Sequence, residues 1–259
     1  MSYFKNVYKA RYILVSLVER DIKNKYRRTI LGISWSLITP LGLVAIIGGV
    51  FSVIFGQQLE VFIPYLFSGL IPWLYIVGCA QGGTNAYLSA QGYIKQTSTP
   101  IEIFPIRVAL VEYVNMLFGI LAFFMINLVL IPTNFSYKMF LILPILVLWM
   151  LLGMSISTIS GIINTYFRDY ALIQSLILQG LFYITPIIWL PEALEVKGYS
   201  FVYVVNPLYY MIELTRSVLI GQNMAGILFW INSIIFTSLF IMIAVFLSNK
   251  VGRKITFRL

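Results

Sequence analysis

The chain has 259 residues, of which 60% are hydrophobic and only 10% are charged. A soluble domain carries about 25% charged residues, so this composition excludes a soluble globular protein and indicates an integral membrane protein. The sequence contains no histidine, which excludes His-based acid–base catalysis and most transition-metal sites. Its single cysteine, Cys79, leaves no intramolecular disulfide. We therefore predict neither a catalytic site nor a metal site in this chain.

Residues 12–28 have the pattern of an amphipathic helix that lies along the cytoplasmic membrane interface. Its apolar residues repeat at helical spacing and are Val15, Val18, Ile22 and Tyr26. Its basic residues form an opposing stripe of Arg20, Lys23 and Arg27. We expect no cleavable signal peptide, because the apolar stretch Tyr12–Val18 is short and charged residues follow it directly.

Two acidic residues stand among the cations of this helix. Glu19 precedes Lys23 and Asp21 precedes Lys25 by four residues, the favourable order for an ion pair within a helix. Binding to anionic lipid, or setting the orientation in the membrane, would explain the cations. Neither explains the acids, and mixed charge on one face favours a surface that meets a protein partner.

Six long runs free of charge follow, and a helix needs about 20 mostly apolar residues to cross a bilayer. We predict an all-α membrane domain with six transmembrane helices, because lipid cannot satisfy open backbone groups. The predicted spans are Thr29–Leu59, Val61–Ile94, Tyr113–Tyr137 (extended upstream through Arg107 and Glu112), Met139–Phe167, Tyr170–Pro191 and Ser217–Asn249. The whole chain, 1–259, would be a single domain, with residues 1–30 as the interface helix and 31–259 as the membrane part.

Positive charge predicts the orientation of these spans. All but three of the eighteen Lys and Arg residues fall on one side of the predicted topology, the exceptions being Lys138, Lys197 and Arg216. Both termini are therefore expected in the cytoplasm, which agrees with an even number of spans. The net charge of +9 is then a cytoplasmic rim and gives no support to nucleic-acid binding.

The segment Leu190–Gln222, between the fifth and sixth spans, is too apolar for a solvated loop and too charged for a simple span. Within it, Tyr209, Ile212, Thr215 and Leu219 share one stripe of a helix. We interpret the segment as a re-entrant helical pair that dips into the membrane and forms an outer gate. The alternative is a helix that lies on the outer membrane surface.

Four charged residues near the spans need partners, because charge is costly in lipid. Arg107 and Glu112 are five residues apart, so they are not natural partners in a helix, and we expect them to face the bundle interior or the cytoplasmic rim. Glu213 and Arg216 are three residues apart and are predicted to pair within their own helix, in support of the gate.

Four segments, in order along the chain, resemble the permease subunits of ABC exporters of polysaccharides, the group that exports O-antigen, capsule and teichoic acid. They are "ERDIKNKYRRTILGISWSLITPL" (Glu19–Leu41), "GYIKQTSTPIEIFPIR" (Gly92–Arg107), "NTYFRDYALIQSLILQGLFYITPIIW" (Asn164–Trp189) and "NPLYYMIELTRSVLIGQ" (Asn206–Gln222). The resemblance covers essentially the whole chain. One departure is Gln96–Thr99, where the family more often carries a second basic or apolar residue.

The resemblance implies a homodimer that sits on two copies of a separate ATPase subunit. This chain has no G-x-x-x-x-G-K-[ST] phosphate loop, so ATP and Mg would be bound by the partner and the chain itself would not be an enzyme. The residues expected to contact the ATPase lie in the interface helix and in the loop after the second span. They are Glu19, Arg20, Asp21, Lys23, Lys95, Thr97, Thr99 and Pro100.

The resemblance implies a glycan substrate carried on a polyprenyl pyrophosphate lipid, and we expect this glycan to be O-antigen. Arg27 and Arg28 stand at headgroup level, where they could hold the pyrophosphate or act only as ordinary positive-inside charge. Sugar rings stack on aromatic side chains, so a glycan conduit or gate is expected to use aromatics of the outer half, unless these form only an interfacial belt. The aromatic residues near the outer half are Tyr65, Trp73, Tyr75, Phe182, Tyr183, Trp189, Tyr209 and Tyr210. The channel or gate is assigned to Trp73, Tyr75, Tyr183, Trp189, Tyr209 and Tyr210.

Other functions fit the sequence less well. A secondary transporter would need carboxylates within the membrane, and Glu112 is the only one in the predicted spans. A membrane-embedded enzyme would need clustered acid–base groups. Two alternatives within the class of ABC permeases stay open: a permease for teichoic acid or capsule, and a permease for drugs or small lipids. The expected location is the cytoplasmic (inner) membrane.

Overall fold

The computed structural model describes the chain except for residues 1, 28, 131–136, 222–223, 256–257 and 259. The described residues are predominantly helical and contain no strand. The helices are α1 (Ser2–Lys9), α2 (Arg11–Tyr26), α3 (Trp35–Phe55), α4 (Leu59–Thr84), α5 (Gln91–Gln96), α6 (Ile103–Leu130), α7 (Ile142–Tyr166), α8 (Tyr170–Ile184), α9 (Glu192–Glu195), α10 (Phe201–Val204), α11 (Pro207–Ile220) and α12 (Ile227–Ile255). Two 3₁₀ turns, η1 (Gly32–Ser34) and η3 (Tyr137–Leu141), precede α3 and α7.

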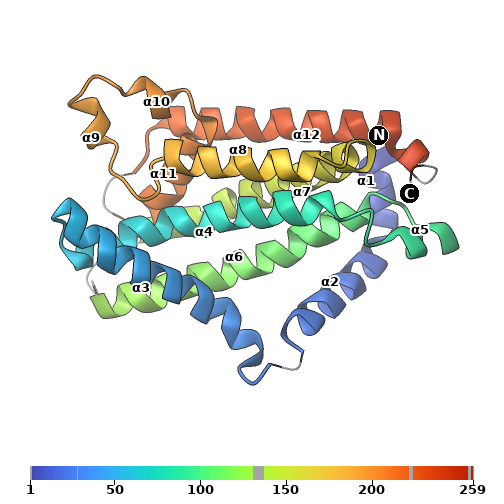
Figure 1. Cartoon of the computed structure of the whole chain (residues 1–259), viewed down its shortest axis with the longest axis horizontal. Helices are drawn as coiled ribbons and strands as arrows, with labels where there is room; N and C mark the ends of the chain where they lie inside the picture. Colours follow the sequence, from blue (N-terminus) through green and yellow to red (C-terminus); the bar gives the residue numbers. More distant parts are fainter. Residues whose placement is uncertain (1, 28, 131–136, 222–223, 256–257, 259) are drawn as a thin grey trace.

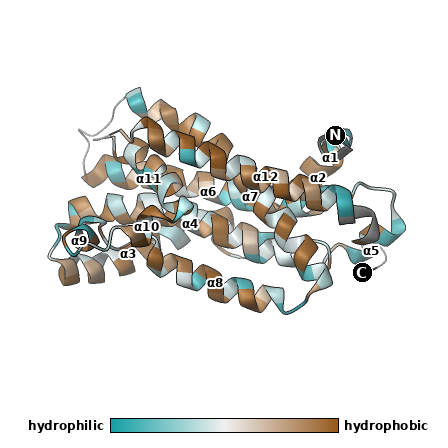
Figure 2. Ribbon diagram, turned by 90° about the horizontal axis from the view of Figure 1, so that it is seen from above, coloured by the Kyte–Doolittle hydropathy of each residue, from teal (hydrophilic) through white to brown (hydrophobic). Residues whose placement is uncertain are grey.

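Five of these helical segments are long and apolar enough to cross a membrane, which confirms an all-α integral membrane protein. They are Gly32–Phe55, Leu59–Thr84, Ile103–Leu130, Tyr137–Tyr166 and Ile227–Lys250. Figure 2 shows these helices to be hydrophobic along most of their length. Many large apolar side chains of α3 and α12 are exposed, as expected where a helix faces lipid.

The fifth predicted helix is shorter than expected. Helix α8 has 15 residues and is about 22 Å long, whereas the bilayer core is about 30 Å thick. It ends at Ile184 because Pro186 disfavours helical geometry at the preceding residue, and Thr185 is extended (φ −84°, ψ 132°). The prediction of a continuous helix to Pro191 was therefore wrong.

Other predicted boundaries also moved. The prediction that the last helix starts at Ser217 was wrong, because Ser217 belongs to α11, which ends at Gly221 with a left-handed φ of 77°. The second predicted span divides into α4 and the short α5. The upstream extension of the third predicted span is confirmed, because α6 begins at Ile103 and includes Arg107 and Glu112.

Helix α4 is the centre of the bundle and packs against α3, α6, α7, α8 and α11. Small residues allow α4 and α7 to approach closely: a Cβ added at Gly83 would lie 2.7 Å from the Cα of Ser157, and one at Gly153 would collide with the Tyr75 hydroxyl. Buried polar groups link the helices. Asn164 Nδ2 donates to the Thr84 carbonyl at the end of α4 (2.9 Å), and Ser157 Oγ donates to the Pro105 carbonyl of α6 (2.9 Å).

The bundle has two distinct ends (Figure 1). Helix α1, the C-terminal part of α12 and α5 lie at one end, and α9 and α10 lie at the other. Helix α2 leads away from the first end and packs against α6. We refer to these as the α5 end and the α9 end.

Candidate functional site

At the α5 end, helix α2 is held on α6 by two ion pairs of opposite polarity. The Asp21 carboxylate of α2 lies 2.9 Å from Arg107 Nε, and Lys25 Nζ lies 3.4 Å from the Glu112 carboxylate. Asp21 and Lys25 are four residues apart on α2, and Arg107 and Glu112 are five residues apart on α6, so each pair is separated by about one helical turn. Both ion pairs can therefore form at the same time, with the acid and the base of α2 each opposite a residue of the other charge on α6.

This arrangement corrects part of the sequence interpretation. The predicted pair Glu19–Lys23 is present, with 4.0 Å between its charged atoms. The predicted pair Asp21–Lys25 is wrong, because each residue pairs with α6 instead. Charges on α6 that needed partners were the available signal, but nothing in the spacing said that α2 supplies them.

The buried face of α2 also differs from the predicted stripe. Leu14 and Leu17 are buried, whereas Val15 is 54% exposed. Leu14, Leu17 and Asp21 occupy positions i, i+3 and i+7 of the helix, and this row faces the rest of the protein. The row that faces α6 is therefore set by the ion pairs as well as by apolar residues, and the exposed Val15 is not part of it.

Most of the residues expected to contact an ATPase are accessible at the α5 end. Glu19, Arg20 and Lys23 of α2 are exposed, as are Lys95 and Thr97 at the end of α5. Asp21, Thr99 and Pro100 are partly exposed. Thr97 Oγ1 lies 3.0 Å from the Tyr93 carbonyl and 2.9 Å from Thr99 Oγ1, which shapes a short turn after α5.

The headgroup candidates lie where α2 ends. Arg27 follows α2 directly and is exposed, whereas Arg28 lies outside the described residues. The neighbouring Tyr26 donates from its hydroxyl to Asn115 Oδ1 of α6 at 3.0 Å and accepts a hydrogen bond from Ser36 Oγ of α3. Tyr26 thus ties the end of α2 to the start of the first membrane helix.

A cavity of about 440 Å³ lies between α3, α4 and α8. Trp73 and Phe182 line it with ring centroids 5.5 Å apart. Polar groups are supplied by Gln81, Ser175 and Gln179. Aromatic faces together with amide and hydroxyl groups are the chemistry that binds sugars. Sequence reasoning named Trp73 and Phe182 but missed the glutamines, and only the packing of α8 beside α4 brings these residues together.

The aromatic candidates at the α9 end form a connected cluster, with Tyr203 at its centre. Tyr203 lies against Trp189 (ring centroids 6.2 Å apart) and Tyr209 (4.8 Å), and Tyr209 lies against Tyr210 (5.3 Å). Burial and a hydrogen bond to Glu195 raise the pKa of Tyr203 to about 12, so its hydroxyl stays protonated and donates at neutral pH. Sequence reasoning missed Tyr203, although it lies within the segment already interpreted as a gate.

Tyr183 and Tyr75 lie outside this cluster. Tyr183 is 66% exposed on α8, although its carbonyl accepts a hydrogen bond from Trp189 Nε1 at 3.0 Å. Tyr75 is buried inside the bundle, where its ring meets Trp149 edge-on with centroids 6.4 Å apart. Packing between α4 and α7 accounts for Tyr75 without a role in a conduit.

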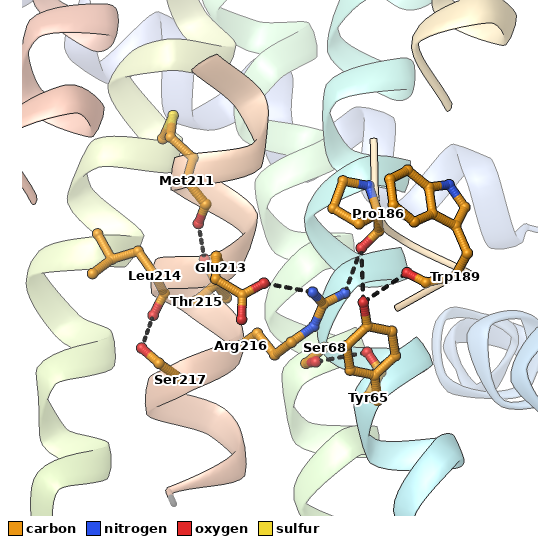
Figure 3. A network of polar contacts seen from close by, with 10 residues as sticks. All are labelled: Tyr65, Ser68, Pro186, Trp189, Met211, Glu213, Leu214, Thr215, Arg216 and Ser217. Atoms are coloured by element: carbon orange, nitrogen blue, oxygen red, sulfur yellow. Dashed lines mark hydrogen bonds and ion pairs between the residues drawn. The ribbon is translucent and has the colours of Figure 1, made fainter. Parts of the chain in front are cut away.

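Arg216 organises the segment that follows α8 (Figure 3). Its guanidinium lies 2.6 Å from the Glu213 carboxylate, which confirms the predicted pair, and Nη2 donates to the Pro186 carbonyl at 2.9 Å. The same guanidinium stacks 3.7 Å from the centroid of the Tyr65 ring. Only 3% of the Arg216 side chain is exposed, and Gly69 leaves the space that it fills, because a Cβ there would lie 2.7 Å from Nη2.

The carbonyls of this non-helical segment are satisfied by side chains from other elements. The Tyr65 hydroxyl of α4 donates to the Trp189 carbonyl at 2.8 Å. Asn206 Nδ2 donates to Thr185 Oγ1 at 2.7 Å, while Asn206 Oδ1 caps α11 by accepting from the Leu208 amide at 3.0 Å. The break in α8 is therefore held by α4 and α11.

Helix α11 runs alongside the middle part of α4. Its first turn, at Leu208, shares a cavity of about 310 Å³ with Ile76 and Ala80 of α4. Arg216, two turns later, lies beside Gly69. Helix α11 therefore runs from the middle of α4 back toward the α9 end, and both of its faces are in contact with protein. The Trp149 indole of α7 donates to Thr215 Oγ1 at 2.9 Å on one side.

Comparison with known proteins places these features in a family. A family model described as ABC-2 type transporter matches residues 12–220. The chain belongs to this family. The ABC-2 match includes α2 and extends to the last residue of α11, so it contains both ion-paired regions described above.

Curated relatives of this ABC-2 protein are named O-antigen export system permease protein RfbA. The one from Myxococcus xanthus is 25% identical over 212 residues, which cover 79% of this chain and 78% of the relative. Two from Klebsiella pneumoniae are 26% and 27% identical over 200 and 207 residues, which cover 77% of both chains in each case. The similarity thus extends over most of the length of this multi-pass membrane protein.

Proposed function

We propose that this chain is the permease subunit of an ATP-driven exporter that moves polyprenyl-pyrophosphate-linked polysaccharide, of the O-antigen type, outward across the inner membrane. The observation that carries this proposal is the similarity to O-antigen export permeases over more than three quarters of the chain. In this assignment the α5 end is cytoplasmic and the α9 end faces outward. The excess of Lys and Arg at the α5 end supports this orientation.

The permease works as a homodimer on two copies of an ATPase subunit, which binds ATP and Mg. The ATPase meets the exposed charges of α2 and the turn after α5, namely Glu19, Arg20, Lys23, Lys95 and Thr97. Movement of α2 passes to α6 through the pairs Asp21–Arg107 and Lys25–Glu112. Asp21 then contacts α6 within the permease and transmits the motion of α2, instead of contacting the ATPase directly.

The glycan passes along the face formed by α3, α4 and α8. The cavity beside Trp73 and Phe182 offers stacking surfaces, and Gln81 and Gln179 offer hydrogen bonds. The pyrophosphate lipid is held by Arg27 and Arg28, which follow α2 in the sequence. Exposed apolar residues on α3 and α8, including Ile46, Leu172 and Leu176, leave this face free for the second permease copy.

The segment 185–221 forms the outer gate as a re-entrant unit, and α8 completes a sixth crossing together with the extended residues after it. The direction of α11, from the middle of α4 toward the α9 end, supports re-entry better than a helix on the membrane surface. The aromatic cluster of Trp189, Tyr203, Tyr209 and Tyr210 would then meet the glycan as it leaves.

Reconstitution tests this function. The permease and its ATPase are placed in vesicles with the ATPase sites outside, and a polyprenyl-pyrophosphate-linked glycan is supplied from that side. We expect ATP-dependent protection of the glycan from an added glycosidase, together with stimulated ATP hydrolysis. Protection without the ATPase, or none with it, contradicts the proposal.

A panel of carriers separates the alternatives. Glycans on polyprenyl pyrophosphate are compared with polyol-phosphate polymers, which represent teichoic acid, and with a fluorescent phospholipid. Stimulation by the polyol-phosphate polymer alone would assign a teichoic-acid exporter, and stimulation by the phospholipid alone would assign a lipid permease.

A further inference from the structure

A third cavity, of about 340 Å³, lies between α2, α3, α4 and α6, and it shares Leu74 and Val77 of α4 with the wall of the α3–α4–α8 cavity. One end of it is polar and is lined by Lys25, Tyr26, Ser36, Glu112 and Asn115. The remaining wall is mainly apolar and includes Pro40, Ile71, Leu74 and Met116. A cavity of this kind fits a molecule with a charged head and an apolar body.

The polar end carries one negative and one positive group that are only loosely joined. Glu112 accepts a hydrogen bond from Asn115 Nδ2 at 2.9 Å, but its ion pair with Lys25 is longer, at 3.4 Å. The Lys25 side chain is 43% exposed. An ammonium has three donors and a carboxylate about four acceptor positions, so both groups can bind a ligand without leaving each other.

The bundle makes room for the carboxylate at this place. A Cβ added to Gly78 of α4 would lie 2.9 Å from Glu112 Oε2, so the absence of a side chain there lets Glu112 reach the cavity wall. The site opens beside Trp35 of α3, which lines the cavity and is 42% exposed. It therefore connects the interface region at the end of α2 with apolar surface.

The charges decide which headgroup fits. Glu112 repels a pyrophosphate, which carries only negative charge. A headgroup with both a primary ammonium and a phosphate matches the site: the ammonium donates to Glu112, and the phosphate accepts from Lys25. A quaternary ammonium has no N–H to donate, so choline is a poorer match.

We propose that this cavity binds a phospholipid with a primary amine, such as phosphatidylethanolamine, with an acyl chain along the wall between α3 and α6. The bound lipid fills the space between α2 and the membrane helices and supports α2 where it rests on α6. The polar end of this site shares no residue with the α3–α4–α8 cavity, and the site does not depend on the identity of the exported glycan.

Native mass spectrometry of the purified full chain tests the site. The protein is equilibrated with equimolar phosphatidylethanolamine, phosphatidylcholine and phosphatidylglycerol, and the retained lipid is measured. We expect phosphatidylethanolamine to be enriched, and Glu112→Gln to reduce its retention by about tenfold through loss of a charge-assisted hydrogen bond. Glu60→Gln, an exposed acid at the opposite end, is the matched control and should retain the lipid.

A second variant keeps the test decisive if Glu112→Gln weakens folding. Thr39 lines the cavity from α3 and is exposed, so Thr39→Phe fills the space without changing either ion pair. It should also abolish the enrichment. Equal retention of the three lipids, or an enrichment that survives both Glu112→Gln and Thr39→Phe, overturns the proposal. So does displacement of phosphatidylethanolamine by a polyprenyl pyrophosphate, because the cavity would then belong to the carrier.

Discussion

The two ends of this permease use ion pairs in opposite ways. At the α9 end, Arg216 is almost fully buried, and its guanidinium holds a carboxylate, a backbone carbonyl and an aromatic ring at once. At the α5 end, Lys25 is 43% exposed and holds Glu112 at 3.4 Å. Low dielectric strengthens the first set and makes its loss costly, whereas water and salt weaken the second. The difference is consistent with the proposed functions of the two ends, a rigid outer gate at the α9 end and a mobile α2 at the α5 end.

The largest expected effect on stability comes from replacing Arg216, the buried cation at the α9 end. Arg216→Met leaves the Glu213 carboxylate without its donor and removes the shorter of two hydrogen bonds to the Pro186 carbonyl, and should lower the free energy of unfolding by about 3 kcal/mol. Thermal unfolding in detergent measures this, and faster proteolysis within residues 185–205 should accompany it. The exposed Lys197→Met, at the same end, should change stability by less than about 0.5 kcal/mol. A variant at Arg216 that melts with the wild type would show that the network does not hold the gate.

The next effect concerns the movable end. Asp21→Arg places two cations together at the contact between α2 and α6, and should cost about 2 kcal/mol and uncouple ATP hydrolysis from transport. The exchanged pair, Asp21→Arg with Arg107→Asp, should restore most of both. Transport and ATP hydrolysis are measured in the reconstituted complex. If the exchange restores nothing, the pair is not what joins α2 to α6.

A smaller effect is expected where α11 begins. Asn206→Ala removes the cap on the Leu208 amide and the hydrogen bond to Thr185, and should cost about 1–2 kcal/mol. Asn232→Ala provides a matched control, because the Asn232 amide also donates a hydrogen bond, but to the Leu228 carbonyl of its own helix, so it bridges no second element. Equal melting temperatures for the two variants would argue against a special role of Asn206 in holding the break after α8.

The smallest effect on stability belongs to the exposed pair of α2. Lys23→Glu breaks a 4.0 Å contact in which both side chains are more than half exposed, so the free energy of unfolding should change by less than about 0.5 kcal/mol. Binding of the ATPase, measured by co-purification, should nevertheless weaken. Lys197→Glu, at the opposite end, should bind the ATPase normally. Unchanged binding by Lys23→Glu would remove α2 from the proposed ATPase contact.

Local pattern alone determined much of this protein. Composition identified a helical membrane protein, and runs of apolar residues located all five long helices, because a spanning helix must be apolar along its length. Helical spacing also predicted the pairs Glu19–Lys23 and Glu213–Arg216, whose partners lie within one turn of the same helix. Six spans, the re-entrant segment and the orientation stay predictions.

Only the tertiary structure decided which distant groups meet. Asp21 and Lys25 pair with residues of α6 that follow more than 80 positions later, so the spacing that predicted Asp21–Lys25 was overruled. Likewise, Arg216 was expected to pair with Glu213, but its bonds to Pro186 and Tyr65 depend on how α4, α8 and α11 pack. Buried charges take as many partners as the fold brings near them, because leaving a donor or acceptor unpaired away from water is costly.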